Sequence, residues 1–468
     1  MAFISLLVMT RYVADQYGVM IWGLALVSLV NTVADMGFNS ANLKFIAKKG
    51  YDQSACFSTY MVVKAILTVI MVIITIVTVY IMESTGAIDQ EAMYVCLVFV
   101  IYQIISNIQF SIYYTLDGMM KSGKSAILTI VECSIRNAIL IIMALFYVDA
   151  VTLSSAYVIA TAISGVLSIV LIRREGIKLV RPKYLREYTI FAMPLAAALI
   201  LTSVVSNLDK VIVGLFFDSI EVTFYSTAVG LIATFTAIGV SLNNVLLPHL
   251  SKNIAEDAMT ERTLWALERC LFIILCPFIA FFIILGPEVA EVLFGDNFSP
   301  SGQMIAVLSV QIIPFVLSGI MTQVLYAINK GTAYLRASTL LCIFAVIGFI
   351  ILIPDSGFMP FCMGYGGIGA AASVVIAYII FAFMLMLMVK KYTNFRIYPK
   401  IWKILLAFVL CIGSLMLMDH FIEISGLILL AITGIICEAV FVIALYLMKE
   451  INERDIRVIL RKMKEDED

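Results

Sequence analysis

Four cationic residues lie in stretches that are otherwise apolar enough to be membrane helices: Arg11, Lys64, Arg136 and Lys210. A charge in hydrocarbon costs at least ~2.5 kcal/mol, so such a residue normally faces a cavity or a partner. The chemistry that suits an ammonium or guanidinium group there is anion binding, because cations attract phosphate oxygens strongly where water is scarce. These residues therefore predict a site for an anionic ligand.

Lys64 and Arg136 are predicted to lie at the same depth in the membrane. Each stands about 14 Å along its expected helix from the same side, at 1.5 Å per residue. Asp35 and Asn107, on two further expected helices, reach a similar height, and Asn31 shares a helix face with Asp35. The full set of candidate substrate-binding residues is Arg11, Asn31, Asp35, Lys64, Gln103, Asn107, Arg136, Asp209, Lys210 and Gln311.

These charges also have a purely structural interpretation. Glu132 and Arg136 lie one helical turn apart on the same face, and an ion pair between them could lock the bundle. Lys64 and Asp35 could pair in the same way. The two remaining cations lie near expected helix ends, from which long side chains can reach the membrane surface.

One segment fits a nucleotide-binding pattern. Gly118–Ser125 reads GMMKSGKS, which matches the P-loop pattern G-x-x-x-x-G-K-S. A P-loop joins a buried strand to a helix, so that its backbone N–H groups surround a phosphate. Here the flanking segments 91–116 and 126–148 are apolar and of membrane-helix length. We therefore expect a short turn between two membrane helices and no bound nucleotide.

The composition argues against a soluble enzyme. Hydrophobic residues make up 62% and charged residues 13% of the chain, and the mean hydropathy is +1.05. The longest loops have about 15 residues, too few for an ATPase or glycosyltransferase domain. Two histidines and nine dispersed cysteines, without a CxxC pair, argue against a metal site. We expect a protein that is not an enzyme and has no cofactor.

Apolar runs long enough to span a bilayer recur along the whole chain. Loops rich in lysine and arginine alternate with loops that have few or none, which is the pattern of cytoplasmic and outer loops. The alternation predicts about 14 crossings and a cytoplasmic C-terminus. The expected helices span residues 1–13, 18–46, 55–82, 91–116, 126–148, 151–172, 188–216, 221–247, 264–286, 303–328, 333–354, 364–389, 400–418 and 423–448.

The two halves of the chain resemble each other. Residues 16–49 align with 221–254, and further on Gln103 corresponds to Gln311. We therefore expect an all-α membrane protein with two six-helix lobes related by pseudo-symmetry, plus two extra helices. The expected divisions are an N-terminal lobe at 1–172, a basic cytoplasmic linker at 173–187, a C-terminal lobe at 188–389, two further helices at 390–448 and a charged cytoplasmic tail at 449–468.

The first expected helix is short. Its residues span only ~20 Å of a hydrocarbon core that is ~30 Å thick. The aligned helix of the second half begins near Tyr188, so a complete first helix would begin before Met1. We expect the reading frame to start upstream; the alternative is a natural short helix with water reaching its start.

Several motifs resemble those of a known family. They are NLDKVIVGLF at 207–216, YSTA at 225–228, PHLS at 248–251, VLFG at 292–295 and GGIGAA at 366–371. In this order and spacing the chain resembles the polysaccharide and oligosaccharide flippases (Wzx-type flippases of O-antigen or lipid-linked oligosaccharide) of the multidrug/oligosaccharidyl-lipid/polysaccharide exporter superfamily. The resemblance covers nearly the whole chain.

The resemblance implies a multi-pass protein of the cell membrane with two lobes around a central cavity. It implies flipping of an oligosaccharide linked to a polyprenyl phosphate or pyrophosphate, from the cytoplasmic to the outer leaflet, by alternating access for cell-surface polysaccharide biosynthesis. The implied partners are this substrate, membrane lipids and polysaccharide assembly enzymes, with no nucleic acid and no nucleotide.

Two alternatives remain open from the sequence. A multidrug or cation antiporter of the same superfamily would have acidic residues without cations in its cavity. A membrane-embedded polysaccharide polymerase or ligase would need a large outer loop with catalytic arginine or histidine, and the outer loops here are short.

Overall fold

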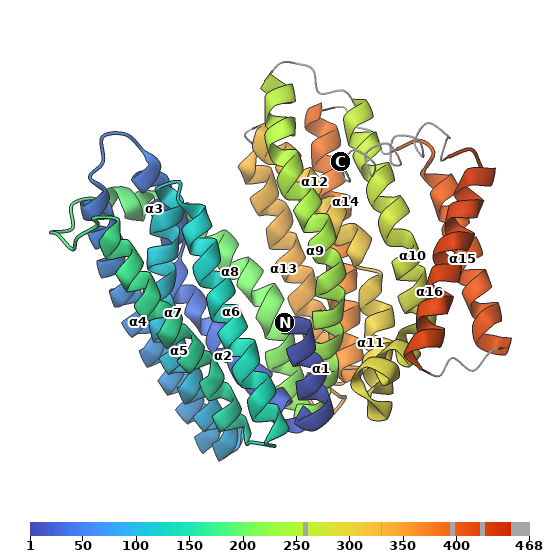
Figure 1. Ribbon diagram of the computed structural model, residues 1–468, viewed down its shortest axis with the longest axis horizontal. Coiled ribbons are helices and arrows are strands. Elements are labelled where there is room, and N and C mark those ends of the chain that lie inside the picture. Colours follow the sequence, from blue (N-terminus) through green and yellow to red (C-terminus); the bar gives the residue numbers. More distant parts are fainter. Residues whose placement is uncertain (256–260, 329, 394–397, 422–425, 451–468) are drawn as a thin grey trace, which may run out of the picture. The chain divides into compact units, whose positions relative to one another are not determined.

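The computed structural model describes residues 1–468 except 256–260, 329, 394–397, 422–425 and 451–468. All regular secondary structure in the described ranges is helical (Figure 1). Thirteen helical segments in these ranges are long and apolar enough to cross a membrane, one of them the run Asp296–Leu325, and the shorter apolar helix α1 (Ala2–Tyr12) precedes them. The prediction of an all-α membrane protein with about 14 crossings and a short first helix is confirmed.

Aspartates begin three of the membrane helices. Asp52, Asp89 and Asp149 each accept a hydrogen bond from a backbone N–H of the first turn, which satisfies a group that the helix leaves unpaired. The helices are α1 (Ala2–Tyr12), α2 (Ala14–Asp35), α3 (Phe38–Ala47), α4 (Gln53–Ser84), α5 (Gln90–Gly118), α6 (Ser122–Leu145), α7 (Ala150–Arg174), α8 (Leu185–Phe216), α9 (Ser219–Ala255), α10 (Glu261–Phe294), the 3₁₀ helix η1 (Asp296–Phe298), α11 (Ser299–Ser309), α12 (Ile312–Ala327), α13 (Gly331–Leu352), α14 (Gly366–Thr393), α15 (Ile401–Phe421) and α16 (Leu427–Leu447).

The contacts group the chain into two compact units. The first comprises Met1–Thr227 and Ser338–Ser373, and the second comprises Ala228–Ala337 and Val374–Asp468. The division into two six-helix lobes with a linker at 173–187 remains a prediction from the sequence repeat.

In the first unit, α5 lies among the other helices of its bundle (Figure 1). It packs against α2, α4 and α7 and also contacts α3 and α6. Polar side chains on such a helix are shielded from water and lipid on most sides, so they need hydrogen-bond partners on the neighbouring helices. The polar side chains of α5 are therefore expected to point toward polar groups on the neighbouring helices.

The sequence predicts one helix over 18–46, and this prediction is wrong. The helix breaks after Asp35, where Met36 and Gly37 take left-handed backbone conformations with φ of 38° and 81°. A left-handed residue ends an α-helix, and glycine adopts this conformation without strain. The segment beyond the break forms the separate short helix α3, whose Phe45 stacks on Tyr188 of α8 with ring centres 4.9 Å apart.

In the second unit, α10 packs against α11, α15 and α16. Its backbone departs from helical geometry at Leu285, with φ of −104° and ψ of 21°, just ahead of Pro287. Proline lacks an N–H and disfavours helical backbone before it, which explains the kink. The expected helix 303–328 is interrupted, because α11 ends at Ser309 and α12 begins at Ile312, although the run Asp296–Leu325 still forms one segment long enough to cross a membrane.

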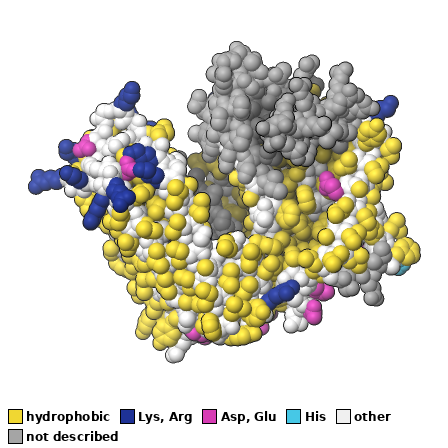
Figure 2. Space-filling model, viewed as in Figure 1, with side chains coloured by type: hydrophobic (Ala, Val, Ile, Leu, Met, Phe, Trp, Pro, Cys, Tyr) yellow, Lys and Arg dark blue, Asp and Glu magenta, His cyan; other side chains and the backbone are white. Residues whose placement is uncertain are grey.

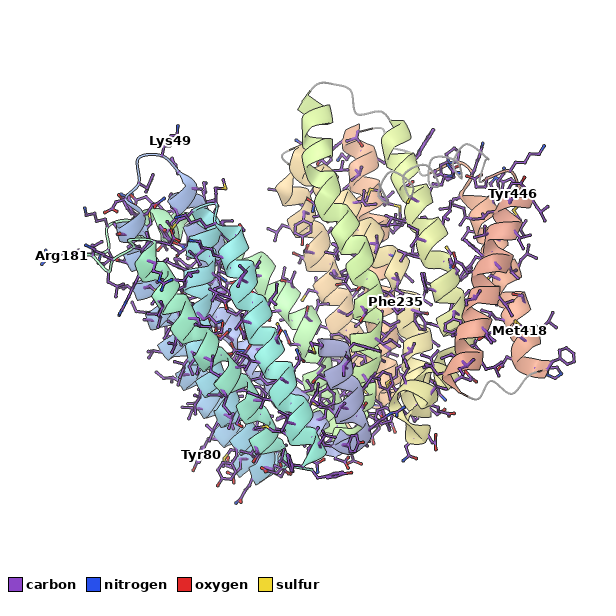
Figure 3. The ribbon with its side chains drawn as sticks, in the orientation of Figure 1. Lys49, Tyr80, Arg181, Phe235, Met418 and Tyr446 are labelled. Carbon is purple, nitrogen blue, oxygen red and sulfur yellow. The ribbon has the colours of Figure 1, made fainter. Side chains whose placement is uncertain are left out.

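Charge and apolar surface are separated on the first unit. Figure 2 shows lysine and arginine side chains gathered at one end of this unit, with hydrophobic side chains over its flank. Lys49 and Arg181 lie at this basic end of the bundle and Tyr80 lies at the opposite end (Figure 3). An apolar flank between polar ends is the surface of a protein that sits in a bilayer.

Candidate substrate site

The first polar cluster of the site is centred on Lys64 of α4. Its side chain is buried, with 4% of the residue exposed. The Nζ atom donates a hydrogen bond of 3.3 Å to Oδ1 of Asn107 on α5. The amide of Asn107 in turn donates a hydrogen bond of 2.8 Å to Oδ1 of Asn31 on α2. Three helices of the first unit thus meet around one buried cation.

Gln103 extends this cluster by one helical turn along α5. Its Nε2 donates a hydrogen bond of 3.3 Å to the hydroxyl of Ser28 on α2. We refer to Ser28, Asn31, Lys64, Gln103 and Asn107 as the Lys64 cluster. The structure therefore brings together four of the predicted site residues, and Ser28 is the member that the sequence analysis missed.

Asp35 lies at the edge of the Lys64 cluster. Its Oδ1 accepts a hydrogen bond of 3.4 Å from the backbone N–H of Asn39, and its charge interacts electrostatically with Lys64. Within the described part of the chain, however, no carboxylate oxygen lies within 4.0 Å of the Lys64 ammonium. The direct Lys64–Asp35 ion pair of the structural interpretation is therefore not formed. Lys64 is a buried cation whose hydrogen-bond acceptor is a neutral amide.

The second polar cluster is centred on Arg136 of α6. Its guanidinium forms an ion pair of 3.6 Å with Glu132, as the spacing of the two residues predicted. The same group lies over the ring of Tyr157 on α7, with Cζ 4.9 Å from the ring centre. The Arg136 side chain keeps 21% of its surface exposed, so it is less enclosed than Lys64.

Glu132 is held by hydrogen bonds from two further helices. Gln109 on α5 donates a bond of 2.8 Å to Oε2, and Thr161 on α7 donates a bond of 3.3 Å to Oε1. Gln109 also donates to the hydroxyl of Ser164 at 2.8 Å. We refer to Gln109, Glu132, Arg136, Tyr157, Thr161 and Ser164 as the Arg136 cluster. A carboxylate with this many donors stays in place when its arginine moves.

The two clusters lie on different faces of α5. Asn107 serves the Lys64 cluster and Gln109, two residues later, serves the Arg136 cluster. Residues two apart on a helix point in different directions. Among the described residues no hydrogen bond joins one cluster to the other. Lys64 and Arg136, which the sequence predicts at equal depth, therefore belong to two separate clusters on different sides of α5.

The remaining predicted residues lie elsewhere. On α8, the buried Asp209 accepts a hydrogen bond of 2.7 Å from the hydroxyl of Tyr225 and forms an ion pair of 3.2 Å with Lys210. Arg11 is exposed in the last turn of α1. Gln311 belongs to the second unit, between α11 and α12, and its buried Oε1 has no hydrogen-bond partner among the described atoms.

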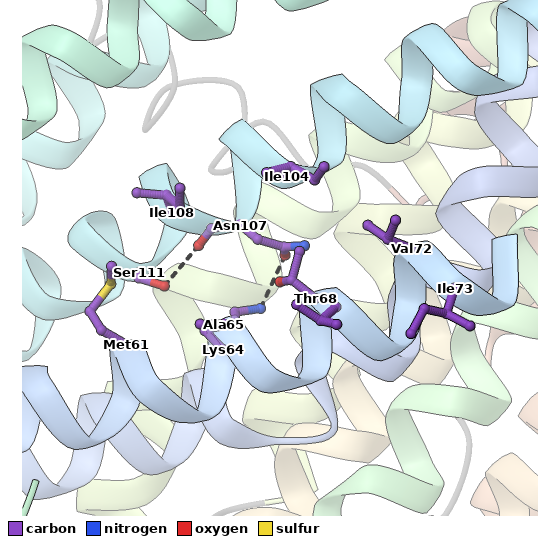
Figure 4. Close-up of a pocket in the computed structure, with 11 residues that line it drawn as sticks. Met61, Lys64, Ala65, Thr68, Val72, Ile73, Ile104, Asn107, Ile108 and Ser111 are labelled. Carbon is purple, nitrogen blue, oxygen red and sulfur yellow. Dashed lines mark hydrogen bonds between the residues drawn. The ribbon is translucent and has the colours of Figure 1, made fainter. Parts of the chain in front are cut away.

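A groove borders the Lys64 cluster. It has a volume of about 370 Å³ and lies between α4 and α5, with Met61 and Ser111 at one end, Ile73 at the other, and Lys64 and Asn107 between them (Figure 4). Most of its wall is apolar, formed by Met61, Ala65, Val69, Val72, Ile73, Ile104 and Ile108. The Lys64 ammonium is buried against Asn107, so the accessible wall of the groove is apolar.

The P-loop-like segment forms the turn that was expected. Gly118 ends α5 and α6 begins at Ser122. The ammonium groups of Lys121 and Lys124 both pair with the carboxylate of Glu175, which follows α7. These hydrogen bonds, first from Lys121 and then from Lys124, hold the pKa of Glu175 below its usual value. Both lysines tie the basic end of the bundle together.

A family of polysaccharide biosynthesis proteins matches residues 8–303, which is more than half of the chain. The chain therefore belongs to this family of polysaccharide biosynthesis proteins, and the expected membership is confirmed. No curated protein matches the chain in sequence.

Solved structures share the fold. The lipid II flippase MurJ, in an inward closed conformation, has a TM-score of 0.75 at 15% identity and covers 95% of this chain and 96% of its own. An inward-facing multidrug resistance MATE transporter of the MOP superfamily has a TM-score of 0.65 at 12% identity, with 84% and 95% covered. A MOP superfamily transporter from Pyrococcus furiosus has a TM-score of 0.53 at 13% identity, with 83% and 94% covered. These likenesses place the chain in the MOP transporter fold.

Proposed function

We propose that this protein flips an oligosaccharide linked to a polyprenyl phosphate or pyrophosphate from the cytoplasmic to the outer leaflet of the cell membrane. The transport would proceed by alternating access of the two expected lobes and would supply cell-surface polysaccharide biosynthesis. Family membership supports this function, and the fold is one that transporters use. We propose no catalytic residue, because flipping forms and breaks no covalent bond.

One observation carries the proposal more than any other. Lys64 is buried in the membrane-spanning part of the first unit, and its hydrogen-bond acceptor is the neutral Asn107. Burying an ammonium group without a carboxylate partner costs free energy, and a charged residue inside a membrane segment is typical of a functional site. A phosphate oxygen that replaced the amide contact would gain a charge-assisted hydrogen bond.

The other predicted residues have roles that follow from their chemistry. Arg136 lies on the other side of α5, so its proposed role is a separate contact with an anionic group of the substrate, made if its ion pair of 3.6 Å with Glu132 opens. Asn31, Gln103, Asn107 and Gln311 offer amides to sugar hydroxyls. The charged groups Arg11, Asp35, Asp209 and Lys210 complete the proposed set, as contacts for the head group or as groups that orient it.

The proposed orientation places the basic end of the first unit and the C-terminus in the cytoplasm. Lysine and arginine gather at this end, where Lys49 and Arg181 lie (Figures 2 and 3). Short loops rich in these residues are retained on the cytoplasmic side. The proposed partners are the lipid-linked substrate, the surrounding lipids and the enzymes that assemble the polysaccharide.

A transport assay tests the function. Purified protein is reconstituted into vesicles with a polyprenyl pyrophosphate-linked oligosaccharide that carries a fluorophore on the sugar, and a membrane-impermeant quencher reports which leaflet holds the label. The wild-type chain should move label between leaflets, and the Lys64→Gln variant should not. Empty vesicles and the exposed Lys178→Gln variant are the controls. No transport by the wild-type chain would contradict the proposal, and proton-coupled efflux of cationic drugs instead would favour the antiporter.

A further inference from the structure

The linker of residues 175–184, between α7 and α8, is fixed to the start of α4 through its backbone. The N–H of Val180 donates a hydrogen bond of 2.7 Å to the hydroxyl of Ser58. The N–H of Lys183 donates one of 3.2 Å to the hydroxyl of Thr59. These bonds satisfy backbone groups that no regular secondary structure pairs. The linker therefore has a defined place beside α4, and so have its side chains.

Apolar and cationic side chains are interleaved on the outside of this linker and at the start of α8. Ile177 is buried in the core of the first unit, with 8% of the residue exposed. Leu179 and Leu185, in contrast, are 74% and 52% exposed. The cations between and after these two leucines are exposed as well. We refer to Leu179, Arg181, Lys183, Leu185 and Arg186 as the linker patch.

The cations of the linker patch differ from other cations at the basic end of the first unit. Lys121 and Lys124 pair with the carboxylate of Glu175, and the ammonium of Lys44 lies 3.9 Å from the ring centre of Phe191. Within the described residues, the three cations of the linker patch form no ion pair and face no aromatic ring. They are therefore available to an anionic partner outside the chain.

The length of α4 places the linker patch at the level of the lipid headgroups. The helix has 32 residues and is about 48 Å long, whereas the hydrocarbon core is ~30 Å thick. Centred on the core, α4 extends about 9 Å beyond it at each end, and Ser58 and Thr59 lie within about 9 Å of Gln53 along the helix. Arg181 projects sideways from the bundle, whereas Lys49 lies at its tip (Figure 3).

We propose that the linker patch binds anionic phospholipids in the leaflet at the basic end of the first unit, which is the cytoplasmic leaflet in the proposed orientation. The lipid phosphates lie on the guanidinium and ammonium groups, and Leu179 and Leu185 enter the upper part of the acyl chains. An exposed leucine alone is common at a protein surface, but here exposed leucines are interleaved with free cations. The sideways position at headgroup depth favours a lipid over a cytoplasmic protein.

Fluorescence quenching by labelled lipids tests this contact. The full chain with Leu179→Cys, in the Cys270→Ser background, carries a bimane and is reconstituted into vesicles of phosphatidylcholine and phosphatidylglycerol. Two preparations of equal composition differ only in which lipid carries a nitroxide near the top of its acyl chain. Quenching should be about fivefold stronger when phosphatidylglycerol carries the nitroxide, because basic side chains enrich anionic lipid beside them. Equal quenching by both lipids, or quenching by neither, would overturn the proposal.

Two pairs of cations separate the linker patch from the net charge of the protein. Arg181→Gln/Lys183→Gln should make quenching by the two lipids nearly equal. Lys390→Gln/Lys391→Gln removes the same charge from two exposed lysines in the last turn of α14 and should leave the fivefold preference unchanged. Loss of the preference in both double variants, or in neither, would overturn the assignment to the linker patch.

Competition by inorganic phosphate distinguishes a lipid from a soluble anion. An excess of phosphate, added at constant ionic strength so that screening does not change, should leave the preference for phosphatidylglycerol intact. Loss of the preference would show a site for a soluble anion and overturn the proposal. The vesicles contain no lipid-linked oligosaccharide, so this result is independent of the proposed transport function.

Discussion

The ammonium of Lys64 donates a 3.3 Å hydrogen bond to the side-chain oxygen of Asn107, and both residues are almost completely buried. A neutral amide offsets only part of the cost of enclosing a charge. The charge therefore persists in the fold at the expense of stability. This relationship separates Lys64 from Arg136, which has a carboxylate partner, and it leads to opposite expectations for the two cations.

Replacement of Lys64 should reduce transport without destabilising the protein. Lys64→Met removes a buried charge and keeps an apolar stem of similar length, so we expect an unchanged or higher melting temperature in detergent. Transport should fall about tenfold or more, because the phosphate loses its charge-assisted contact. Lys178→Met, which changes an exposed lysine, is the control for both measurements. A lower melting temperature with normal transport would indicate that Lys64 is structural.

Arg136 and Glu132 should behave as a coupled pair in stability. Removing one partner of a buried ion pair leaves an uncompensated charge and costs about 3–5 kcal/mol, so Arg136→Gln should lower the melting temperature. The double variant Glu132→Gln/Arg136→Gln leaves no charge, and its stability should return close to that of the wild type.

Transport distinguishes the two roles of this pair. If Arg136 contacts the substrate, the double variant is stable but transports poorly, and Arg136→Lys retains part of the activity, because lysine keeps the charge and loses the fork of two donors. Full transport by the stable double variant would contradict a substrate role for Arg136.

Much of the fold could be predicted from the sequence. Apolar runs of membrane length and alternating basic loops indicate the helices, because the bilayer imposes both constraints locally along the chain. The break at Met36–Gly37 could not be predicted in this way. The residues on both sides of it have the pattern of a continuous helix, and a left-handed conformation at a methionine leaves no mark in the hydropathy of the sequence.

The candidate site could be predicted only in part. The depth of Lys64 and Asn107 follows from counting residues along their helices, and the structure brings these two residues together. Which helices face each side of α5 depends on the packing order, and the sequence does not state it. For this reason Gln109 and Ser164 were missed, although Gln109 lies just two residues from Asn107. The polar stripe of Ser28, Asn31 and Asp35 on α2 was the signal that could have indicated Ser28.

The turn at Gly118–Ser125 should contribute to stability in a pH-dependent way and should not bind nucleotide. Lys121 and Lys124 lower the pKa of Glu175 below its usual value, which is about 4.3 in an unfolded chain. The contribution is therefore complete above about pH 4.3 and is lost as the pH falls through the lower value of the folded protein. Melting curves of wild type and Glu175→Gln should converge below this range.

The same turn should not bind nucleotide, so Lys124→Ala should transport normally. Stoichiometric ATP binding by the wild-type protein that is lost in Lys124→Ala would contradict this expectation.

The proposed orientation predicts which loops are accessible from outside the cell. Ala87, between α4 and α5, lies at the end of the bundle opposite the basic end, whereas Lys178, after α7, lies at the basic end; both residues are exposed. Cysteine at each position, in a Cys270→Ser background that removes the exposed native thiol, is treated with a membrane-impermeant maleimide in intact cells. Ala87→Cys should react at once and Lys178→Cys only after the membrane is opened, because arginine- and lysine-rich loops stay in the cytoplasm. The reverse pattern would invert the topology and with it the direction of transport through the Lys64 cluster. Equal reactivity of both before opening would show that the two loops do not lie on opposite sides of the membrane.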